Sequence, residues 1–197
     1  GLAIALEVGL KKAKELAEKF NKPLIAINHM EGHLLSSFVE PNGKKNILVK
    51  DLMHDYKIKF KKGSAIGVLV SGGHTEIILV KDFFNYQKIG ETEDDACGEC
   101  LDKCARMLGL GYPGGPVISK LAKENKKNIQ YTILNKNQSR IVTLKNINTG
   151  RTYQLPVPMA FSPNLNFSYS GLKTAFSSLV SSLSVTKDEI FDLCSII

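Results

Sequence analysis

No apolar run in this sequence approaches the length of a membrane span, and no basic segment followed by an apolar leader is present. Arginine is scarce, so lysine supplies most of a formal net charge of +7. The four cysteines are too clustered for a secreted disulfide framework, because three of them lie within residues 97–104. We therefore expect no membrane association, reduced thiols and a cytoplasmic setting.

The chain has 197 residues, 43% of them hydrophobic and 23% charged, which is an ordinary globular mixture. Its lysines gather in residues 11–14, 57–62 and 120–127. Such clusters favour an anionic partner, RNA included, although solvated lysines on helix faces are the more common explanation. The sequence opens at Gly1 inside a predicted helix, 2–20, and closes inside another apolar-periodic stretch that starts near Lys187. We therefore expect an internal part of a longer protein.

Two histidines four residues apart are the most informative local feature. The apolar run Leu24 to Ile27 predicts a short strand, and Asn28 suits the N-cap of a helix that runs to about Val39. His29 and His33 then share one helix face, where they can hold an ion such as zinc or iron. The alternative is a pair of helix-start histidines that bond to backbone or solvent.

The same segment lacks the arrangement of a zinc peptidase. In the H-E-x-x-H pattern the glutamate directly follows the first histidine and acts as the base. Here the acid is Glu31, midway between the histidines, which places it on the far side of the helix, about 200° from each. This geometry argues against peptidase chemistry.

Periodicity and turn residues predict most of the remaining elements. A hairpin of buried strand 65–70 and strand 76–80 is followed by a possible third strand at 83–89. The predicted helices are 94–108, which ends at Gly109, then 117–125 and 172–183. Residues 44–63 predict a surface excursion after a turn at 41–43, and residues 129–157 predict a β excursion with a turn at 148–150.

Two glycine turns are candidate anion cradles. Ser71-Gly72-Gly73-His74-Thr75 joins two strands, and paired glycines allow positive φ and expose backbone N–H groups. Gly114-Gly115-Pro116 precedes a helix, whose N-terminal dipole favours an anion. Ordinary turns explain both segments as well.

Acids and thiols cluster around the 94–108 helix. The segment 93–95 is predicted to cap its N-terminus, and Asp102 either faces a cleft or is solvated. Cys97, Cys100 and Cys104 share roughly one face. They favour small buried residues over a thiolate metal site, since a fourth ligand is missing nearby. Ser170 is predicted as the N-cap of the 172–183 helix.

Taken together and in order, these segments resemble the tRNA threonylcarbamoyladenosine transferase family, formerly described as O-sialoglycoprotein endopeptidase. The resemblance extends over nearly the whole chain and is carried by Gly1-Leu2 onward, His29 to His33, 69–75, 90–96, 101–103, 108–116 and 167–174. Residues 41–63 and 129–157 look like insertions.

The resemblance implies an α/β, actin-like or sugar-kinase-like ATPase fold of two ribonuclease-H-like lobes, of which this is a partial chain. Residues 1–63 would be the end of the first lobe, with the metal-binding helix, and 64–197 most of the second. It also implies an acyltransferase that moves a threonylcarbamoyl group from threonylcarbamoyl-AMP to the N6 amine of the adenosine next to the anticodon of tRNA. Partner subunits of a transfer complex would assist, and this fragment alone would be inactive.

Carried over by position, His29 and His33 would bind one divalent metal ion, with Fe²⁺ ahead of Zn²⁺. The residues implied to contact the adenylate are Leu69, Val70, Ser71, Gly72, Gly73, Asp102 and Gly115. A family aspartate after the second glycine turn is replaced here by Ser119, and the third metal ligand would lie beyond residue 197. No general base can be assigned.

Two other functions are compatible with parts of the pattern. One is a metallopeptidase, the older description of the family, which the position of Glu31 disfavours. The other is a non-catalytic paralogue within a tRNA-modifying complex, which would be expected to lose the histidine pair that this chain keeps.

Overall fold

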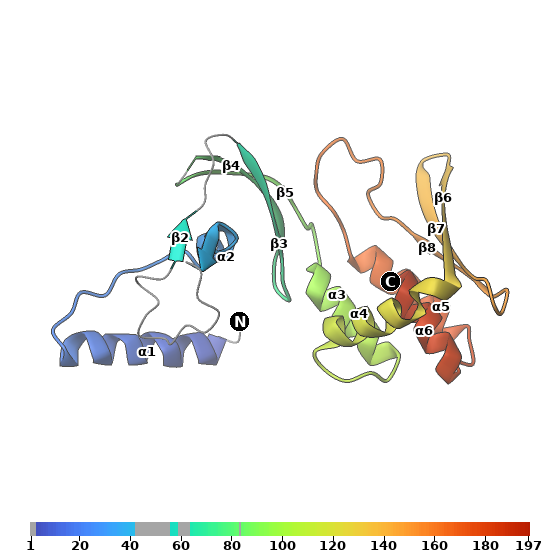
Figure 1. The fold of residues 1–197 in the computed structure, drawn as a ribbon, viewed down its shortest axis with the longest axis horizontal. Coiled ribbons are helices and arrows are strands. Elements are labelled where there is room, and N and C mark those ends of the chain that lie inside the picture. Colours follow the sequence, from blue (N-terminus) through green and yellow to red (C-terminus); the bar gives the residue numbers. More distant parts are fainter. Residues whose placement is uncertain (1–2, 42–55, 59–63, 83) are drawn as a thin grey trace. The chain divides into compact units, whose positions relative to one another are not determined.

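The computed structural model of the protein describes residues 3–41, 56–58, 64–82 and 84–197 (Figure 1). The chain divides into two compact units, residues 1–63 and 64–197. Helices and strands follow one another in blocks along it, so the fold class is mixed α/β. In the described part of the chain, no helix is long and apolar enough to cross a membrane.

The first unit contains helix α1 (Ala3–Lys19), helix α2 (His29–Ser36) and the antiparallel strands β1 (Val39–Pro41) and β2 (Tyr56–Ile58). Helix α2 ends three residues before the predicted Val39, because that residue begins β1. The predicted turn at 41–43 and most of the 44–63 excursion lie outside the described residues.

The predicted strand from Leu24 to Ile27 is wrong. The chain there is irregular, and the side chains of Leu24 and Ile27 are 50% and 79% exposed. A strand needs a neighbour to satisfy its backbone N–H and C=O groups. None of the described strands pairs with this segment.

The second unit begins with the antiparallel sheet β3 (Ala65–Val70), β4 (Thr75–Asp82) and β5 (Asn85–Glu91), paired in that order. The hairpin is confirmed, with Val70 opposite Thr75 at its closed end. The expectation that the first strand is buried is wrong. Its alternate residues Ile66, Val68 and Val70 are all more than half exposed, because no described element of residues 64–197 packs on that face.

Four helices and a second sheet complete this unit. The helices are α3 (Cys97–Met107), α4 (Gly114–Asn125), α5 (Ser170–Ser181) and α6 (Lys187–Ile196). Helix α3 stops where expected, since Gly109 adopts a φ of +70°. Helix α4 starts three residues earlier than predicted, at Gly114. A capping box between Thr186 and Glu189 starts α6.

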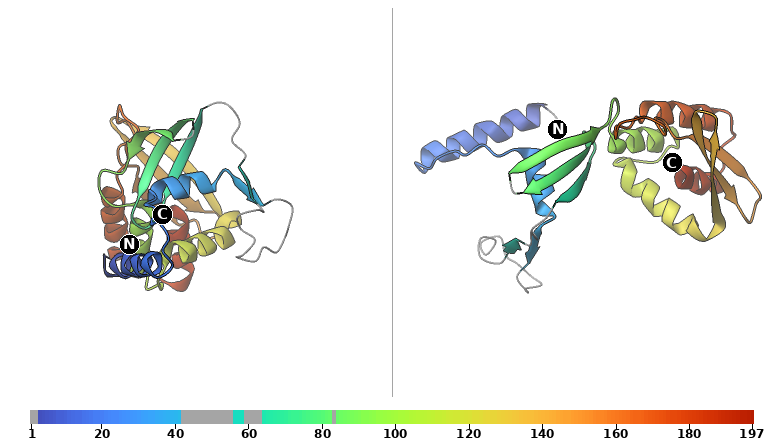
Figure 2. Two further views of the ribbon diagram at one scale, coloured as in Figure 1. Left: turned by 90° about the vertical axis from the view of Figure 1, so that its left-hand side faces the viewer. Right: turned by 90° about the horizontal axis from the view of Figure 1, so that it is seen from above.

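The predicted β excursion is an antiparallel meander of β6 (Ile129–Lys136), β7 (Ser139–Asn146) and β8 (Thr152–Pro156), which follows the short 3₁₀ helix η2 (Lys126–Asn128). Gly150, with a φ of +74°, closes the predicted turn between β7 and β8. Figure 2 shows this sheet beside the helices of the same unit.

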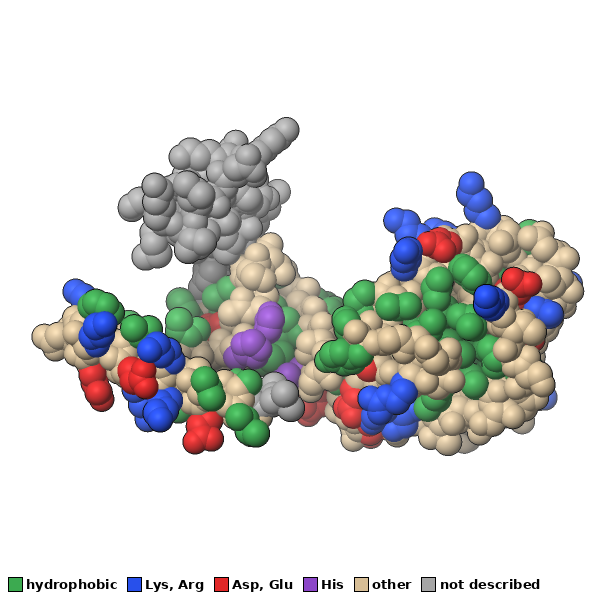
Figure 3. All heavy atoms as spheres, turned by 90° about the horizontal axis from the view of Figure 1, so that it is seen from below, with side chains coloured by type: hydrophobic (Ala, Val, Ile, Leu, Met, Phe, Trp, Pro, Cys, Tyr) green, Lys and Arg blue, Asp and Glu red, His purple; other side chains and the backbone are tan. Residues whose placement is uncertain are grey.

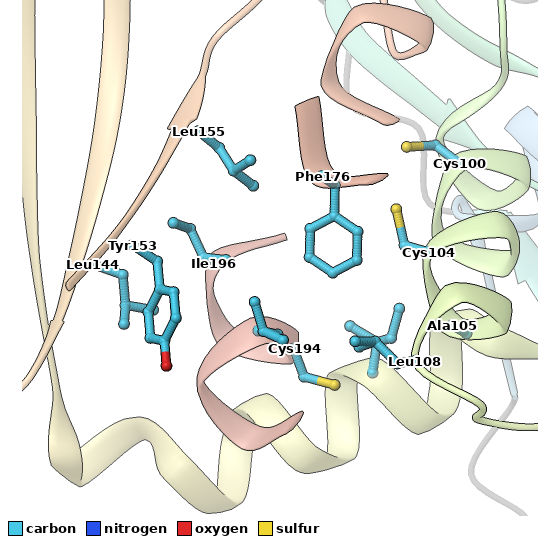
Figure 4. Close-up of a cluster of buried hydrophobic side chains, with 12 residues drawn as sticks. Cys100, Cys104, Ala105, Leu108, Leu144, Tyr153, Leu155, Phe176, Cys194 and Ile196 are labelled. Carbon is cyan, nitrogen blue, oxygen red and sulfur yellow. The ribbon is translucent and has the colours of Figure 1, made fainter. Parts of the chain in front are cut away.

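Phe176 of α5 lies at the centre of the main core and is fully buried (Figure 4). It packs between the cysteine face of α3 on one side and residues of the meander on the other, with α6 closing the cluster. Leu144, Tyr153 and Leu155 of the meander are all buried in this core. Residues 129–157 therefore contribute to the core of the unit.

Candidate metal and nucleotide site

The two histidines of α2 converge. Asn28 caps the helix as predicted, since its side-chain oxygen accepts hydrogen bonds from the backbone N–H groups of Met30 and Glu31, at 3.0 and 3.2 Å. His29 and His33 then project from one exposed face. Their Nε2 atoms lie 3.1 Å apart, and their rings meet edge to face with centroids 4.4 Å apart. Histidine side chains are visible at the surface in Figure 3.

This geometry suits two ligands of one ion. Imidazole nitrogens bind zinc at about 2.1 Å, so two of them at an angle of about 90–110° lie roughly 3.0–3.4 Å apart. The observed 3.1 Å falls within that range. In the part of the chain that the structure describes, no group of three or more His, Cys, Asp or Glu residues could hold a metal. As metal ligands, the pair would form an incomplete set that needs at least one further ligand.

Glu31 does not join the pair. It is half-buried whereas both histidines are exposed, and its Oε1 atom is buried without a hydrogen-bond partner among the described residues. The different environments of Glu31 and the two histidines are consistent with the expected position of Glu31 on the far side of the helix, which stays a prediction.

The glycine turn between β3 and β4 differs from the expectation in two ways. Neither Gly72 nor Gly73 has a positive φ. The Ser71 hydroxyl oxygen accepts hydrogen bonds from the N–H groups of Gly73 and His74, at 3.3 and 3.0 Å, so these donors are already used. Gly72 keeps an N–H without an acceptor in the described structure. An added Cβ at either glycine would meet no atom within 4 Å, so the main chain here is open to a ligand.

The start of α3 fastens this turn. Gly98 donates its N–H to the carbonyl of Ser71 at 3.1 Å, and Cys97 donates its N–H to the hydroxyl of Thr75 at 2.8 Å. Thr75 is only 2% exposed. A Cβ on Gly98 would come within 2.7–2.9 Å of backbone atoms of Ser71 and Gly72. The close approach of helix and turn therefore requires glycine at this position.

Asp102 holds the second glycine turn. Its Oδ1 atom accepts a hydrogen bond of 2.7 Å from the N–H of Gly114, the first residue of α4. A Cβ on Gly114 would lie 2.5 Å from the side chain of Ala105, so α3 and α4 touch here. Part of the predicted anion cradle is thus filled by the protein's own carboxylate.

The two glycine turns meet the same face of α3. Gly98 and Asp102 are four residues apart and so lie one above the other on that helix. Gly98 contacts the turn at 71–73, and Asp102 contacts the turn at 114–115. The structure thus brings together these three predicted segments. The placement of the histidine pair relative to them stays a prediction.

The sequence suggested that Asp94 caps the 94–108 helix, and this expectation is wrong. Helix α3 starts at Cys97 with no side-chain cap. Asp94 instead caps α5: one oxygen accepts from the N–H groups of Tyr169 and Ser170, and the other from the hydroxyls of Ser168 and Ser170. The expectation that Ser170 is the N-cap is therefore wrong, because Tyr169 holds that position and the capping group comes from Asp94.

The neighbouring Asp95 pairs with two lysines, Lys103 of α3 and Lys173 of α5. The hydrogen bond from Lys173 lowers the pKa of Asp95, with desolvation opposing and Lys103 adding to the effect. For Asp94, desolvation raises the pKa, but the hydrogen bonds from Ser168, Ser170 and Tyr169 outweigh it and hold the pKa far below its ordinary 3.8. Two carboxylates thus tie α5 to the start of α3.

An Asp94→Asn variant should reveal this link through its pH dependence. A carboxyl group whose pKa is lowered by folding contributes stability above about pH 4, and that contribution is lost as the pH falls toward its folded pKa. The variant should therefore lose more of its unfolding free energy relative to wild type at pH 7 than at pH 3. Urea unfolding across that range measures this, with the exposed Glu7→Gln on α1 as control; a difference that does not vary with pH would contradict the assignment.

The cysteines behave as small buried residues, as predicted. Cys100 and Cys104 are buried in the core beside Phe176 (Figure 4). Cys97 is half-buried. All are free thiols.

Sequence reasoning missed Thr75, Gly98 and Gly114 as positioning residues. A glycine inside a predicted helix, as at Gly98, indicates close backbone approach, but the sequence does not say to which segment. Thr75 reads only as the last residue of the glycine turn, and nothing in the sequence indicates its contact with Cys97.

Comparisons with known proteins agree with the motifs. The family model TsaD, "tRNA N6-adenosine threonylcarbamoyltransferase", matches residues 1–51 and 50–197, which include both segments that looked like insertions. A relative of that name from Wolbachia sp. subsp. Brugia malayi is 36% identical over 195 residues, or 99% of this chain and 46% of the relative. One from Ralstonia pickettii is 38% identical over 189 residues, or 96% of this chain and 43% of the relative.

This chain thus spans less than half the length of such relatives. The match nevertheless runs through the histidine helix, both glycine turns and the Asp94–α5 link. The chain belongs to the tRNA N6-adenosine threonylcarbamoyltransferase family.

Proposed function

We propose that the whole protein transfers a threonylcarbamoyl group from threonylcarbamoyl-AMP to the N6 amine of the adenosine next to the anticodon in tRNA. The observation that carries the proposal is the convergence of His29 and His33, with ring nitrogens 3.1 Å apart on an exposed helix face. In the proposed fold, residues 1–63 belong to the first lobe of an actin-like ATPase architecture and residues 64–197 to the second. We place the protein in the cytoplasm, with tRNA and partner subunits.

His29 and His33 would hold one divalent ion, Fe²⁺ first and Zn²⁺ as the alternative, completed by a ligand outside these residues. Imidazole suits both metals. When bound, the ion supplies Lewis-acid polarisation of the carbamoyl group.

The residues of the second unit would bind the nucleotide half of the substrate. Gly72 offers a free N–H, and Gly115 lies in the first turn of α4, where N–H groups lack partners within the helix. Such donors stabilise the charge on a phosphate as AMP leaves. Leu69 and Val70 end β3 directly before the turn, and Val70 is more than half exposed.

Asp102 would serve the ribose. Its Oδ1 is occupied by Gly114, which fixes the carboxylate and leaves Oδ2 to accept from a ribose hydroxyl. The same contact holds Gly114, the residue before Gly115, against Asp102. No general base is assigned to any residue in this chain.

A metallopeptidase function gains no support from the geometry. Its base would have to be Glu31, whose Oε1 atom is buried whereas both histidines are exposed. A non-catalytic paralogue is disfavoured because the histidine pair is intact and convergent.

The test is a transfer assay with the full-length protein, preformed threonylcarbamoyl-AMP, unmodified tRNA and partner subunits. Formation of modified adenosine is expected. A full-length protein that binds metal and tRNA but never transfers the group would refute the proposal.

A further inference from the structure

The positive charge of this chain is concentrated in one segment. Residues 120–151 contain eight lysines and arginines and a single acid, Glu124, a net charge of +7. The whole chain also has a formal net charge of +7, with 26 basic and 19 acidic residues. The other residues therefore carry 18 positive and 18 negative charges, and their net charge is zero.

Most of these charges have no ion-pair partner in the part of the chain that the structure describes. Six of them are exposed lysines that form no ion pair with the described residues: Lys120, Lys123, Lys126, Lys127, Lys136 and Lys145. By contrast, Arg151 lies 3.9 Å from Glu189, and Arg140 stacks over Phe161. The lysines lie on the end of α4, on η2 and on the β6–β7 hairpin.

Strand alternation places two of the lysines on the solvent side of the meander. Leu144 and Asn146 are buried, so Lys145 between them points to the opposite face. The register puts Gln130 beside Lys145 and places Lys136 opposite Ser139 on the same face. We call this the outer sheet face; its members are Gln130, Thr132, Leu134, Lys136, Ser139, Ile141, Thr143, Lys145, Thr152, Gln154 and Pro156.

The outer sheet face contains no carboxylate. Apart from its two lysines, its polar groups are hydroxyls and amides, as in the pair where Gln154 donates to Thr143 at 3.2 Å. Lys126 and Lys127 flank one end of β6 and Lys136 lies at the other. Eight residues at about 3.3 Å each separate these ends by about 26 Å, a distance that spans several phosphates of a nucleic acid. Figure 3 shows Lys and Arg side chains standing out from the surface of residues 64–197.

We infer that the outer sheet face, together with Lys126 and Lys127, binds the phosphodiester backbone of RNA. Lysines supply sequence-independent attraction to phosphates, and hydroxyl and amide side chains donate to phosphate and sugar oxygens. A membrane surface would call for large apolar or aromatic groups among the lysines, and this face offers only Leu134 and Ile141. The inference rests on the proposed function, in which the RNA is the tRNA substrate.

The test is a fourfold variant of the full-length protein, in which Lys126, Lys127, Lys136 and Lys145 are replaced by glutamine. Its Kd for unmodified tRNA should rise at least about tenfold at ~0.1 M salt, and the slope of log K against log salt should fall by about 3. In the transfer assay KM for tRNA should rise while KM for the adenylate stays unchanged. The matched control replaces Lys11, Lys12, Lys14 and Lys19 of α1 with glutamine, which removes the same charge. It should leave Kd, the salt slope and both KM values near wild type.

An unchanged Kd and salt slope in the fourfold variant would overturn the inference. A variant that loses only its binding to a partner subunit, with tRNA binding unchanged, would overturn it as well. Equal weakening by the α1 control would also overturn it, since overall charge would then explain binding. A wild-type protein that binds tRNA through these lysines but transfers nothing would overturn the proposed function and leave the surface assignment standing.

Discussion

Replacing either His29 or His33 with alanine should remove most of the bound metal from the full-length protein and slow threonylcarbamoyl transfer by at least about a hundredfold, a loss of about 3 kcal/mol of transition-state stabilisation. The reason is that the two imidazoles converge on one point, 3.1 Å apart, so neither alone can hold the ion with the same geometry. Elemental analysis of the purified variants and the transfer rate measure the two effects together.

Two further variants separate ligand loss from damage to the helix. Ser37→Ala, at the exposed C-cap of α2, should leave metal content and rate unchanged. His33→Cys supplies another donor to the same metals and should recover part of the metal content. Full metal content in either alanine variant would refute the ligand assignment.

A Gly98→Ala substitution should raise KM for the adenylate roughly tenfold and destabilise the fold by about 1–3 kcal/mol, the usual range for overpacking. The new Cβ would meet backbone atoms of Ser71 and Gly72 at 2.7–2.9 Å, and a backbone cannot rotate away as a side chain can. The turn at residues 71–73 must therefore move away from α3. Steady-state kinetics and urea unfolding measure the two effects.

Gly111→Ala is the matched control, because a Cβ there meets nothing within 4 Å. Thr75→Val provides an independent change at the same junction: it keeps the side-chain shape and removes the acceptor of the Cys97 N–H. It should also raise KM for the adenylate. If Gly98→Ala bound the adenylate as wild type does, the turn would not depend on its contact with α3.

Local signals in the sequence predicted local structure well. Asn28 capped its helix, Gly109 ended α3, and the glycine turn joined two strands in register. In each case the determining interaction lies within a few residues of the signal. The convergence of the histidines follows from the same spacing rule.

Errors arose where a distant segment competes for a residue. Asp94 reads as a cap for the helix that follows it, yet it caps α5, more than 70 residues later, because four donors of that loop converge on its carboxylate. Asp102 likewise satisfies the start of α4. The run Leu24 to Ile27 has the apolar content of a strand, but content does not supply a hydrogen-bonding neighbour.

The most direct test of the account is a single-turnover reaction of full-length protein with labelled threonylcarbamoyl-AMP and unmodified tRNA, run on metal-loaded and chelator-treated enzyme. We expect label on the tRNA adenosine with the loaded enzyme. After metal removal the rate should be at least about a hundredfold lower, and it should return when metal is added back. Equal rates with and without metal would contradict it.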